Sequence, residues 1–202
     1  MPNRTPSHPT RERLVETMTE LLEENPQDIK VDTLLTRSGI SIGSLYHHFD
    51  DLDHLIEIAY IRRFSATVDL SVGVLAHIAA TAKSQKEVLE ALGNVTRATQ
   101  AQEIASTRFE RARIVAMTEH NERFAMVMRS EQQRLTSAIT DLIREAQERG
   151  WYSNDFDPAA AAVLIQAYTL GRVVDDVAEE PVDPDAWIAL IDRLIERTFA
   201  AE

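Results

Sequence analysis

The sequence contains no cysteine, which excludes disulfides, thiol nucleophiles and cysteine-ligated zinc. Glycine and proline are also sparse, with 6 and 7 in 202 residues. These two residue types are the poorest helix formers, so their scarcity favours helices. No strand-like alternation, internal repeat or low-complexity tract interrupts the chain. We therefore predict an all-α fold of about nine helices, three short ones followed by five or six long ones.

Long apolar runs are absent as well. Residues 1–10 are polar and include three prolines, unlike the apolar stretch of a signal peptide. The longest apolar run, near residues 72–80, contains His77 and is shorter than a membrane span. These two features predict a cytoplasmic protein without a membrane partner.

Positive charge is in short supply. The formal net charge is −12, and residues 1–63 alone contribute a net −4. This balance argues against a nucleic-acid-binding protein that works by bulk electrostatics, since such proteins neutralise phosphates with many basic groups. Any contact with DNA would have to depend on the local placement of a few side chains.

Three short helices are expected at the beginning of the chain. An apolar stripe of helical period predicts a helix over residues 10–24, with Thr10 as its cap. A second helix is expected over residues 31–38, where Gly39 supplies the left-handed residue of a sharp stop. A third is expected over residues 42–49, capped by Ser41. Two short helices joined by a four-residue turn, after a longer helix, predict a helix-turn-helix.

The remaining helices have clear start signals. Ser84 and Glu87 have the spacing of a capping box, and Asp157-Pro158 and Asp183-Pro184 each combine a cap with proline at the first helical position. We predict helices over residues 109–117, 122–149, 159–178 and 185–200, besides one that begins near Leu52.

The second helix of the helix-turn-helix has one face suited to a DNA groove. At about 100° per residue, Leu45 and Phe49 mark its buried side. The opposite side carries Gly43, where a backbone can approach closely, together with Ser44 and His47, which can hydrogen-bond base edges. The flanking side chains, Tyr46 and His48, are placed to reach phosphates.

Residues 38–49, Ser-Gly-Ile-Ser-Ile-Gly-Ser-Leu-Tyr-His-His-Phe, resemble the helix-turn-helix of the TetR family of transcriptional repressors. That motif has Gly, an aliphatic residue and Ser in the turn, followed by Gly-x-Leu-Tyr-x-His-Phe. The resemblance implies a DNA-binding domain over residues 8–54 and a ligand-sensing and dimerisation domain over residues 55–202. It further implies a homodimer that binds a pseudo-palindromic operator and is released by a small-molecule effector. The DNA-contacting set is Lys30, Ser41, Ile42, Gly43, Ser44, Tyr46, His47 and His48.

Two positions depart from the family pattern. The family usually has Lys three residues after the Phe, where this chain has Leu52 among three aspartates. It also favours Thr or Ser as the cap of the second helix, where this chain has Lys30. Lys30 is a poor cap but could reach a phosphate, which would partly offset the lost lysine.

Two other classes of function compete with this reading. A metal-dependent hydrolase could use the cluster His47, His48, Asp50, Asp51 and His54, since His and carboxylate are competent ligands. However, a contiguous cluster across a helix end rarely converges on one point, and no catalytic motif is present. A helical regulator that binds a protein partner would suit the acidity, but its binding face should be apolar or aromatic at the centre. We therefore predict no catalytic residues, no metal and no cofactor.

The C-terminal helices should form the dimer interface. They carry more apolar and small residues than one helix face needs, which is typical of a four-helix interface with two helices from each subunit. The alternative is that these residues form the core of a single chain. The expected interface residues are Ala160, Leu164, Gly171, Trp187, Ile191 and Leu194.

Polar residues that interrupt apolar stripes are candidates for the ligand pocket. Each is either satisfied locally or lines a cavity, and the local explanation is the commoner one. The candidates are His77, Arg108, Glu131 and Gln132. The mostly aliphatic helices around them suggest an apolar effector.

Overall fold

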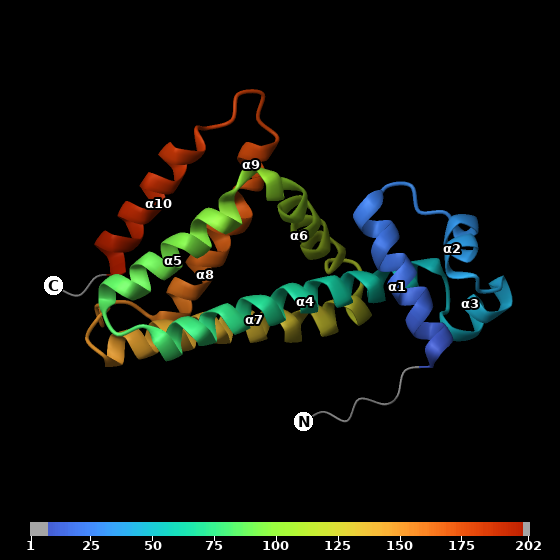
Figure 1. Ribbon diagram of the computed structural model, residues 1–202, viewed down its shortest axis with the longest axis horizontal. Coiled ribbons are helices and arrows are strands. Elements are labelled where there is room, and N and C mark those ends of the chain that lie inside the picture. The colour runs from blue at the N-terminus through green and yellow to red at the C-terminus, as the bar shows by residue number, and fades with distance from the viewer. Residues whose placement is uncertain (1–7, 200–202) are drawn as a thin grey trace. The chain divides into compact units, whose positions relative to one another are not determined.

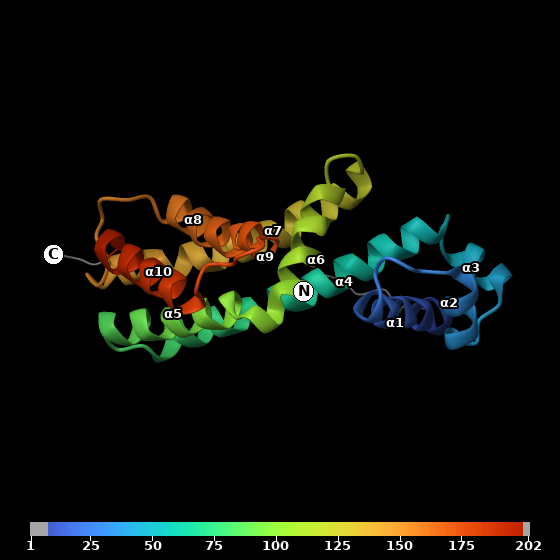
Figure 2. The ribbon, with the colours of Figure 1, turned by 90° about the horizontal axis from the view of Figure 1, so that it is seen from above.

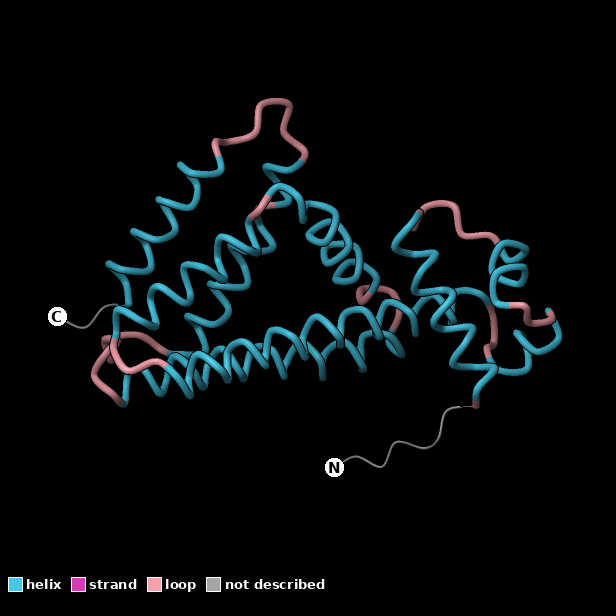
Figure 3. The backbone as a smooth tube through the Cα atoms, in the orientation of Figure 1, coloured by secondary structure: helices cyan, strands magenta, loops and turns pink. Residues whose placement is uncertain are grey.

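The structure is a computed structural model that describes residues 8–199, and it confirms the all-α prediction (Figures 1 and 3). No strand occurs within the described range. The chain divides into two compact units, Met1–Thr67 and Val68–Glu202. The division lies inside helix α4 (Leu52–Thr81). The functional division at residues 54 and 55 stays a prediction.

The first unit contains α1 (Pro9–Glu24), α2 (Val31–Ser38) and α3 (Ile42–His48), and α1 contacts both shorter helices. The predicted cap of α1 is wrong, because the His8 side chain accepts the backbone N–H of Thr10 at 3.3 Å. Pro9 then occupies the first helical position, where its missing N–H costs nothing. The fully buried side chains at the centre of the unit are Leu14, Val15, Met18, Leu34, Leu45 and Leu55.

Helix α4 begins at an aspartate and is unusually apolar. The carboxylate of Asp51 accepts the backbone N–H of His54 at 2.7 Å, so it satisfies one of the free donors of the first turn. By length and composition alone, α4 could cross a membrane, which the sequence-based expectation did not anticipate; core helices of soluble proteins pass the same test. In the structure, Asp69 of α4 forms an ion pair with Arg134 of α7 (Glu122–Glu148).

The second unit continues with α5 (Gln85–Gln100), the short 3₁₀ helix η1 (Gln102–Ile104), α6 (Ala105–Met117), α7, α8 (Pro158–Gly171), α9 (Val173–Asp176) and α10 (Pro184–Phe199). Helix α8 packs along α7, and α10 packs along α5 (Figure 2). Helix α6 contacts α8 and α9. A cavity lies between α5, α7 and α8.

The predicted cap signals of this unit are confirmed. The Ser84 hydroxyl accepts the N–H of Glu87 at 3.3 Å, and the Asp157 carboxylate accepts the N–H of Ala160 at 2.7 Å. Helix α10 begins at Pro184, directly after the predicted cap Asp183.

The single helix expected over residues 159–178 is wrong. Helix α8 ends at Gly171, and the four-residue α9 follows. The chain is held back on itself there, because Arg172 donates to the Val182 carbonyl at 3.3 Å and Asp175 accepts the Val182 N–H at 2.9 Å. Such contacts, seven and ten positions apart, outweigh the local preference for a continuous helix.

Candidate nucleic-acid interface and ligand cavity

The turn between α2 and α3 requires glycine at one position. Gly39 has φ +67°, and its N–H donates to the Leu35 carbonyl at 3.0 Å. Side chains rarely adopt this left-handed conformation, so Gly39 is the stop predicted for α2. Ser41 then caps α3, since its hydroxyl accepts the N–H of Ser44 at 3.3 Å.

Helix α3 exposes the face that the sequence predicts. Leu45 is fully buried and Phe49 nearly so, which anchors α3 against α1. The residues proposed to contact DNA lie on the other side. Ile42, Gly43, Tyr46 and His47 are exposed, and Ser44 and His48 are half-buried.

Gly43 has no internal reason to be glycine. Its backbone is helical, and a Cβ atom built there would have no heavy atom within 4 Å. Nothing in the part of the chain that the structure describes therefore excludes a side chain at this exposed position. The constraint, if one operates, comes from a surface outside the chain that approaches the start of α3.

A small group of histidines lies at the end of α3. The ring of His48 lies 4.8 Å from that of His8 and 5.0 Å from that of His47. Partial burial, together with these histidines and Arg11, lowers the pKa of His48 below its usual value. The Arg11 guanidinium itself lies over the Phe49 ring at 5.2 Å.

Acidic side chains of α1 engage three of the five arginines that the structure describes in this unit. Arg37 forms a bidentate pair with Glu24 at 2.9 and 2.8 Å. About three turns into α4, Arg62 and Arg63 pair with glutamates of α1, Glu12 and Glu23 respectively. Three glutamates of α1 thus hold arginines of the same unit.

The other basic groups near α3 are few, and Lys30 and Arg13 among them also have partners. Lys30 precedes α2 without forming a side-chain cap, as expected, and its exposed ammonium lies 3.1 Å from Asp28. Arg13 donates to the Ser38 carbonyl at 2.5 Å, which fastens α1 to the turn. Arg4, which the sequence places near the entry to α1, lies outside the described residues.

The cluster suggested for a metal does not converge. His54 contacts Asp50, with Nδ1 3.3 Å from a carboxylate oxygen, whereas Asp51 caps α4. Across residues 8–199, no three His, Asp or Glu side chains gather where they could hold a metal ion. The aspartates after α3 are explained by the start of the next helix.

The second unit contains a largely apolar cavity of about 290 Å³. Its walls come from α4, α5, α6, α7, α8 and α10 together with Tyr152. Leu70 of α4 is 72% exposed, so the cavity reaches the surface beside this residue. The apolar lining includes Leu75, Leu92, Leu135, Ile139, Leu142, Ile165 and Phe199, and the polar lining includes Ser71, Thr96, Thr99, Arg111, Gln166 and Tyr168.

The four residues predicted to line a pocket do not lie in this wall. His77 is exposed, and Glu131 pairs with Arg134 at 2.6 Å. Gln132 donates to Gln166 at 2.5 Å, which places it directly behind a lining residue. Arg108 is buried and satisfied locally, as described next. Sequence reasoning missed Arg111, although it shares one side of α6 with Arg108 and the buried Ile114.

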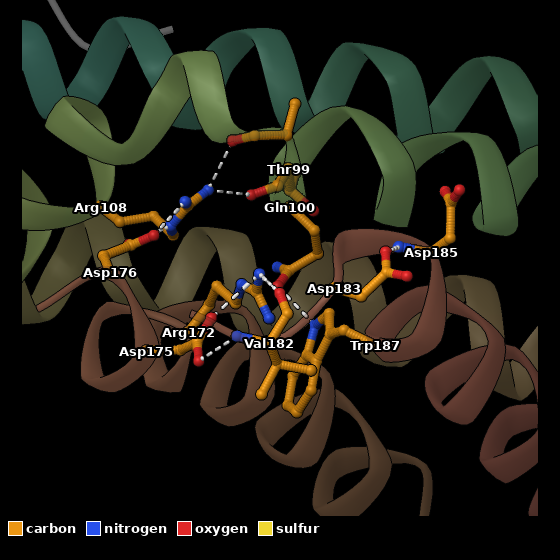
Figure 4. Close-up of polar contacts among 11 residues, drawn as sticks. Thr99, Gln100, Arg108, Arg172, Asp175, Asp176, Val182, Asp183, Asp185 and Trp187 are labelled. Atoms are coloured by element: carbon orange, nitrogen blue, oxygen red, sulfur yellow. Dashed lines mark hydrogen bonds and ion pairs between the residues drawn. The ribbon is translucent and has the colours of Figure 1, made fainter. Parts of the chain in front are cut away.

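A buried polar cluster joins α5, α6, α9 and the start of α10 (Figure 4). Arg108 forms two hydrogen bonds with Asp176 and donates to the carbonyls of Thr99 and Ala101 at 3.2 and 2.9 Å. Nearby, the Trp187 indole N–H donates to Gln100 at 2.9 Å, and the buried Arg172 guanidinium lies 5.4 Å from the Trp187 ring. These contacts join the helices within one chain, although the Gln100 amide nitrogen and two nitrogens of Arg172 have no hydrogen-bond partner among the described residues.

The expected dimer residues fall into two groups. Ile191 is buried against its own chain, and Trp187 is half-buried in the cluster just described. The others are exposed and are joined by further apolar side chains on the same helices. These exposed residues are Ala160, Val163, Leu164 and Gly171 of α8, and Leu190 and Leu194 of α10.

Comparison with known proteins places the chain among transcriptional regulators. The family model described as the C-terminal domain of BetI-type transcriptional repressors matches residues 93–200. The regulator UidR of Escherichia coli K12 is 24% identical over 184 residues, covering 87% of this chain and 86% of its own.

Solved structures show the same fold. GusR of Salmonella enterica has a TM-score of 0.67 at 23% identity, covering 96% of this chain and 97% of its own. A transcriptional regulator from Saccharomonospora viridis, solved in complex with choline, has a TM-score of 0.72 at 17% identity and covers 95% and 98%. UidR and the Saccharomonospora viridis protein are both transcriptional regulators, which confirms the prediction that the chain is not an enzyme. The chain belongs to the TetR family of transcriptional regulators, as a repressor with a BetI-type C-terminal domain.

Proposed function

We propose that this chain represses transcription in the cytoplasm as a homodimer that binds a pseudo-palindromic operator through α3 and is released by a small-molecule effector. The exposed face of α3 is the observation that carries this proposal. It combines hydrogen-bonding side chains with an unconstrained Gly43 and contains no carboxylate. A helix of this kind fits the major groove, where base edges present donors and acceptors.

The face divides into two sets of proposed contacts. Ser44 and His47 would read base edges, and the exposed Ile42 at the start of α3 could contact a thymine methyl group. Tyr46, His48 and Lys30 would position the helix on phosphates. Ser41 caps α3 and would contact the backbone from the turn.

The dimer would form through the exposed apolar surfaces of α8 and α10. Val163 is 56% exposed and Leu190 is 58% exposed, which is unfavourable unless a partner covers them. A second copy of the chain, related by a twofold axis, would bury the same surfaces on both subunits and form a four-helix interface.

The effector would occupy the cavity in the second unit. A volume of about 290 Å³ with mostly aliphatic walls is close to the lower end for small-molecule sites, about 300–1,000 Å³. By linkage, an effector that lowers operator affinity must bind more weakly to the DNA-bound protein, by the same factor. Calorimetry with and without operator measures this factor directly, and equal effector affinities would exclude the release mechanism.

Selection of DNA from a random pool by the full-length protein, followed by footprinting, tests the operator proposal. We expect two half-sites about one helical turn apart, roughly 34–36 Å. Ser44→Ala and His47→Ala should change the base preference, whereas Tyr46→Phe should weaken binding to all sequences by a similar factor. A single asymmetric half-site, or unchanged preference in both alanine variants, would contradict the proposal.

A further inference from the structure

One charged side chain interrupts the cavity wall. Arg111 of α6 lines the cavity, whereas every other lining residue in the described part of the chain is uncharged. Its guanidinium has one protein contact, to the Gln166 side-chain oxygen at 3.5 Å, which is at the outer limit of a hydrogen bond. No carboxylate within residues 8–199 pairs with it.

Arg108, also on α6, shows how an arginine is fully hydrogen-bonded in this fold. Arg108, one helical turn earlier, has a bidentate carboxylate and two carbonyl acceptors. Arg111 has none of these, although it is also largely removed from solvent. Burial lowers the pKa of Arg111, which reflects the cost of holding an unpaired charge in an apolar wall. The guanidinium nevertheless stays protonated in proteins, so the charge persists.

Gln166 is only a weak partner of Arg111, because its side-chain oxygen lies 3.5 Å from the guanidinium. Its side-chain oxygen already accepts from Gln132 at 2.5 Å, and its nitrogen donates to the Ala162 carbonyl and the Thr136 hydroxyl, both at 3.1 Å. The amide is therefore fixed by three shorter bonds. Arg111 lies at the edge of this fixed group with most of its five N–H donors unused.

A tyrosine hydroxyl in the same wall also lacks an acceptor. The Tyr152 hydroxyl is buried and has no hydrogen-bond partner within residues 8–199, whereas the Tyr168 hydroxyl lies 3.2 Å from that of Thr96. Unsatisfied buried donors are rare in native proteins and usually have a reason. The unpaired Tyr152 hydroxyl and the half-buried Arg111 guanidinium, with its single long contact, line the same cavity, and both can donate to an acceptor that enters it.

The rest of the wall limits the shape of the occupant. Leu135, Ile139 and Leu142 line the cavity along about 10 Å of α7, at 1.5 Å of rise per residue. The volume corresponds to about ten water molecules. A compact apolar body with a single polar end matches these dimensions.

We propose that the effector is a small amphipathic carboxylic acid whose carboxylate binds Arg111 and whose alkyl or aryl body fills the cavity. A guanidinium and a carboxylate form two parallel hydrogen bonds, which supply the acceptor that Arg111 lacks. The inference rests on the proposed effector-binding function and narrows it from an apolar molecule to an organic anion.

Calorimetry on the full-length protein, without DNA, tests the proposal with matched probes. Octanoate and 4-phenylbutyrate supply the acid, octanamide and 4-phenylbutanamide remove only the charge, and octyltrimethylammonium reverses it. Each acid should bind at least tenfold more tightly than its amide. Arg111→Gln should weaken acid binding by about 10- to 100-fold and leave amide binding within a factor of about three.

A stability measurement separates a binding role from a structural one. Arg111→Gln should leave the melting temperature of the ligand-free protein unchanged or raise it, because it removes an unpaired buried charge. Arg111→Lys should keep part of the preference for acids, since the charge remains but the bidentate geometry is lost. Arg144→Gln, on the exposed side of α7, is the control and should change neither quantity.

Four results would overturn the proposal: no acid binds, acids and amides bind equally, the ammonium binds most tightly, or Arg111→Gln lowers the melting temperature while keeping the acid preference. Operator binding by the wild-type protein is measured separately. If the acids bind through Arg111 but no operator is found, the proposed repressor function fails and the anion site stands. If an operator is found but the acids do not bind, the repressor function stands and the anion site is wrong.

Discussion

Arg108 and Asp176, 68 positions apart in the chain, form a bidentate ion pair with both side chains almost completely buried. The two nitrogen–oxygen distances are 2.6 Å each. The pair joins α6 to α9, and the remaining donors of Arg108 reach the carbonyls at the end of α5. Three segments therefore depend on one side chain.

Removing one member of this pair should be strongly destabilising. Arg108→Met leaves a buried carboxylate without its partner, and we expect a loss of about 3–5 kcal/mol in the free energy of unfolding. Arg108→Met combined with Asp176→Leu should cost clearly less than the sum of the single losses, because neither charge is then left alone. Urea denaturation measures both. Arg144→Ala, which breaks an exposed pair, should cost less than about 1 kcal/mol. If Arg144→Ala cost as much as Arg108→Met, the buried pair would have no special role in stability.

Low pH should lower the free energy of unfolding through Asp176. Hydrogen bonds from Arg108 hold the pKa of Asp176 below its ordinary value of 3.8. The folded state therefore keeps Asp176 charged at pH values where the unfolded chain binds a proton. Its stabilising contribution is complete above about pH 5 and is lost as the pH falls through the lowered pKa.

This acid dependence can be isolated by comparing urea unfolding at pH 6 and pH 3. Asp176→Asn should be less stable than wild type at pH 6, and the difference should shrink at pH 3. Asp141→Asn, in an exposed pair, should show little change at either pH. A difference between Asp176→Asn and wild type that is constant with pH would exclude the mechanism.

Two glycines of the helix-turn-helix should respond in opposite ways to alanine. Gly39→Ala places a side chain at positive φ and should cost about 1–2 kcal/mol of stability. Gly43→Ala meets no atom and should gain up to about 1 kcal/mol, while weakening operator binding at least tenfold if the DNA approaches this backbone. Thermal unfolding and operator titration of both variants check this. Wild-type operator affinity in Gly43→Ala would place the DNA elsewhere.

The dimer proposal predicts which exposed apolar residues matter. Leu164→Glu and Leu194→Glu each place a charge in the proposed four-helix interface and should weaken association at least 100-fold. Val115→Glu, at a position of α6 that is at least as exposed, should leave the association constant unchanged. Sedimentation equilibrium gives the association constants. Dimers that survive both leucine substitutions would mean that another surface joins the subunits.

Operator affinity should rise as the pH falls from about 8 to 6. His48 is neutral at pH 7–8 in the free protein, because burial and its neighbours lower its pKa, and adjacent phosphates would raise that pKa in the complex. A pKa raised on binding means that protons are taken up. The gain is complete below the free pKa and is lost as the pH rises through the bound pKa. The double variant His47→Gln, His48→Gln should flatten the dependence of operator affinity on pH, measured at constant ionic strength. An unchanged dependence would show that these histidines do not take up the protons.

Local signals predicted most helix starts, because caps act over three or four residues. Ser84, Asp157 and Asp183 mark helix starts in the structure as in the sequence. The end of α8 was missed because Gly171, its last residue, was taken as part of one longer helix. Arg172 and Asp175 hold Val182, and contacts across a loop leave no periodic trace in the sequence.

The candidate sites differ in the same way. The exposed face of α3 follows from helical geometry once Leu45 and Phe49 are known to be buried. The charged residue of the cavity cannot be found from helical geometry, because whether an arginine has a hydrogen-bond partner depends on a residue elsewhere in the chain. Arg108 and Arg111 are equivalent in sequence, and only the position of Asp176 separates the paired charge from the unpaired one.

The glutamates that engage Arg37, Arg62 and Arg63 have a consequence for the search along the chromosome. A guanidinium already held by a carboxylate displaces few counterions from DNA, so its contribution to sequence-independent affinity is small. Random genomic sites, which outnumber an operator by about a millionfold or more, should then sequester little of the protein. We expect a large fraction of the molecules to remain free, so that a small number of copies per cell suffices to occupy the operator.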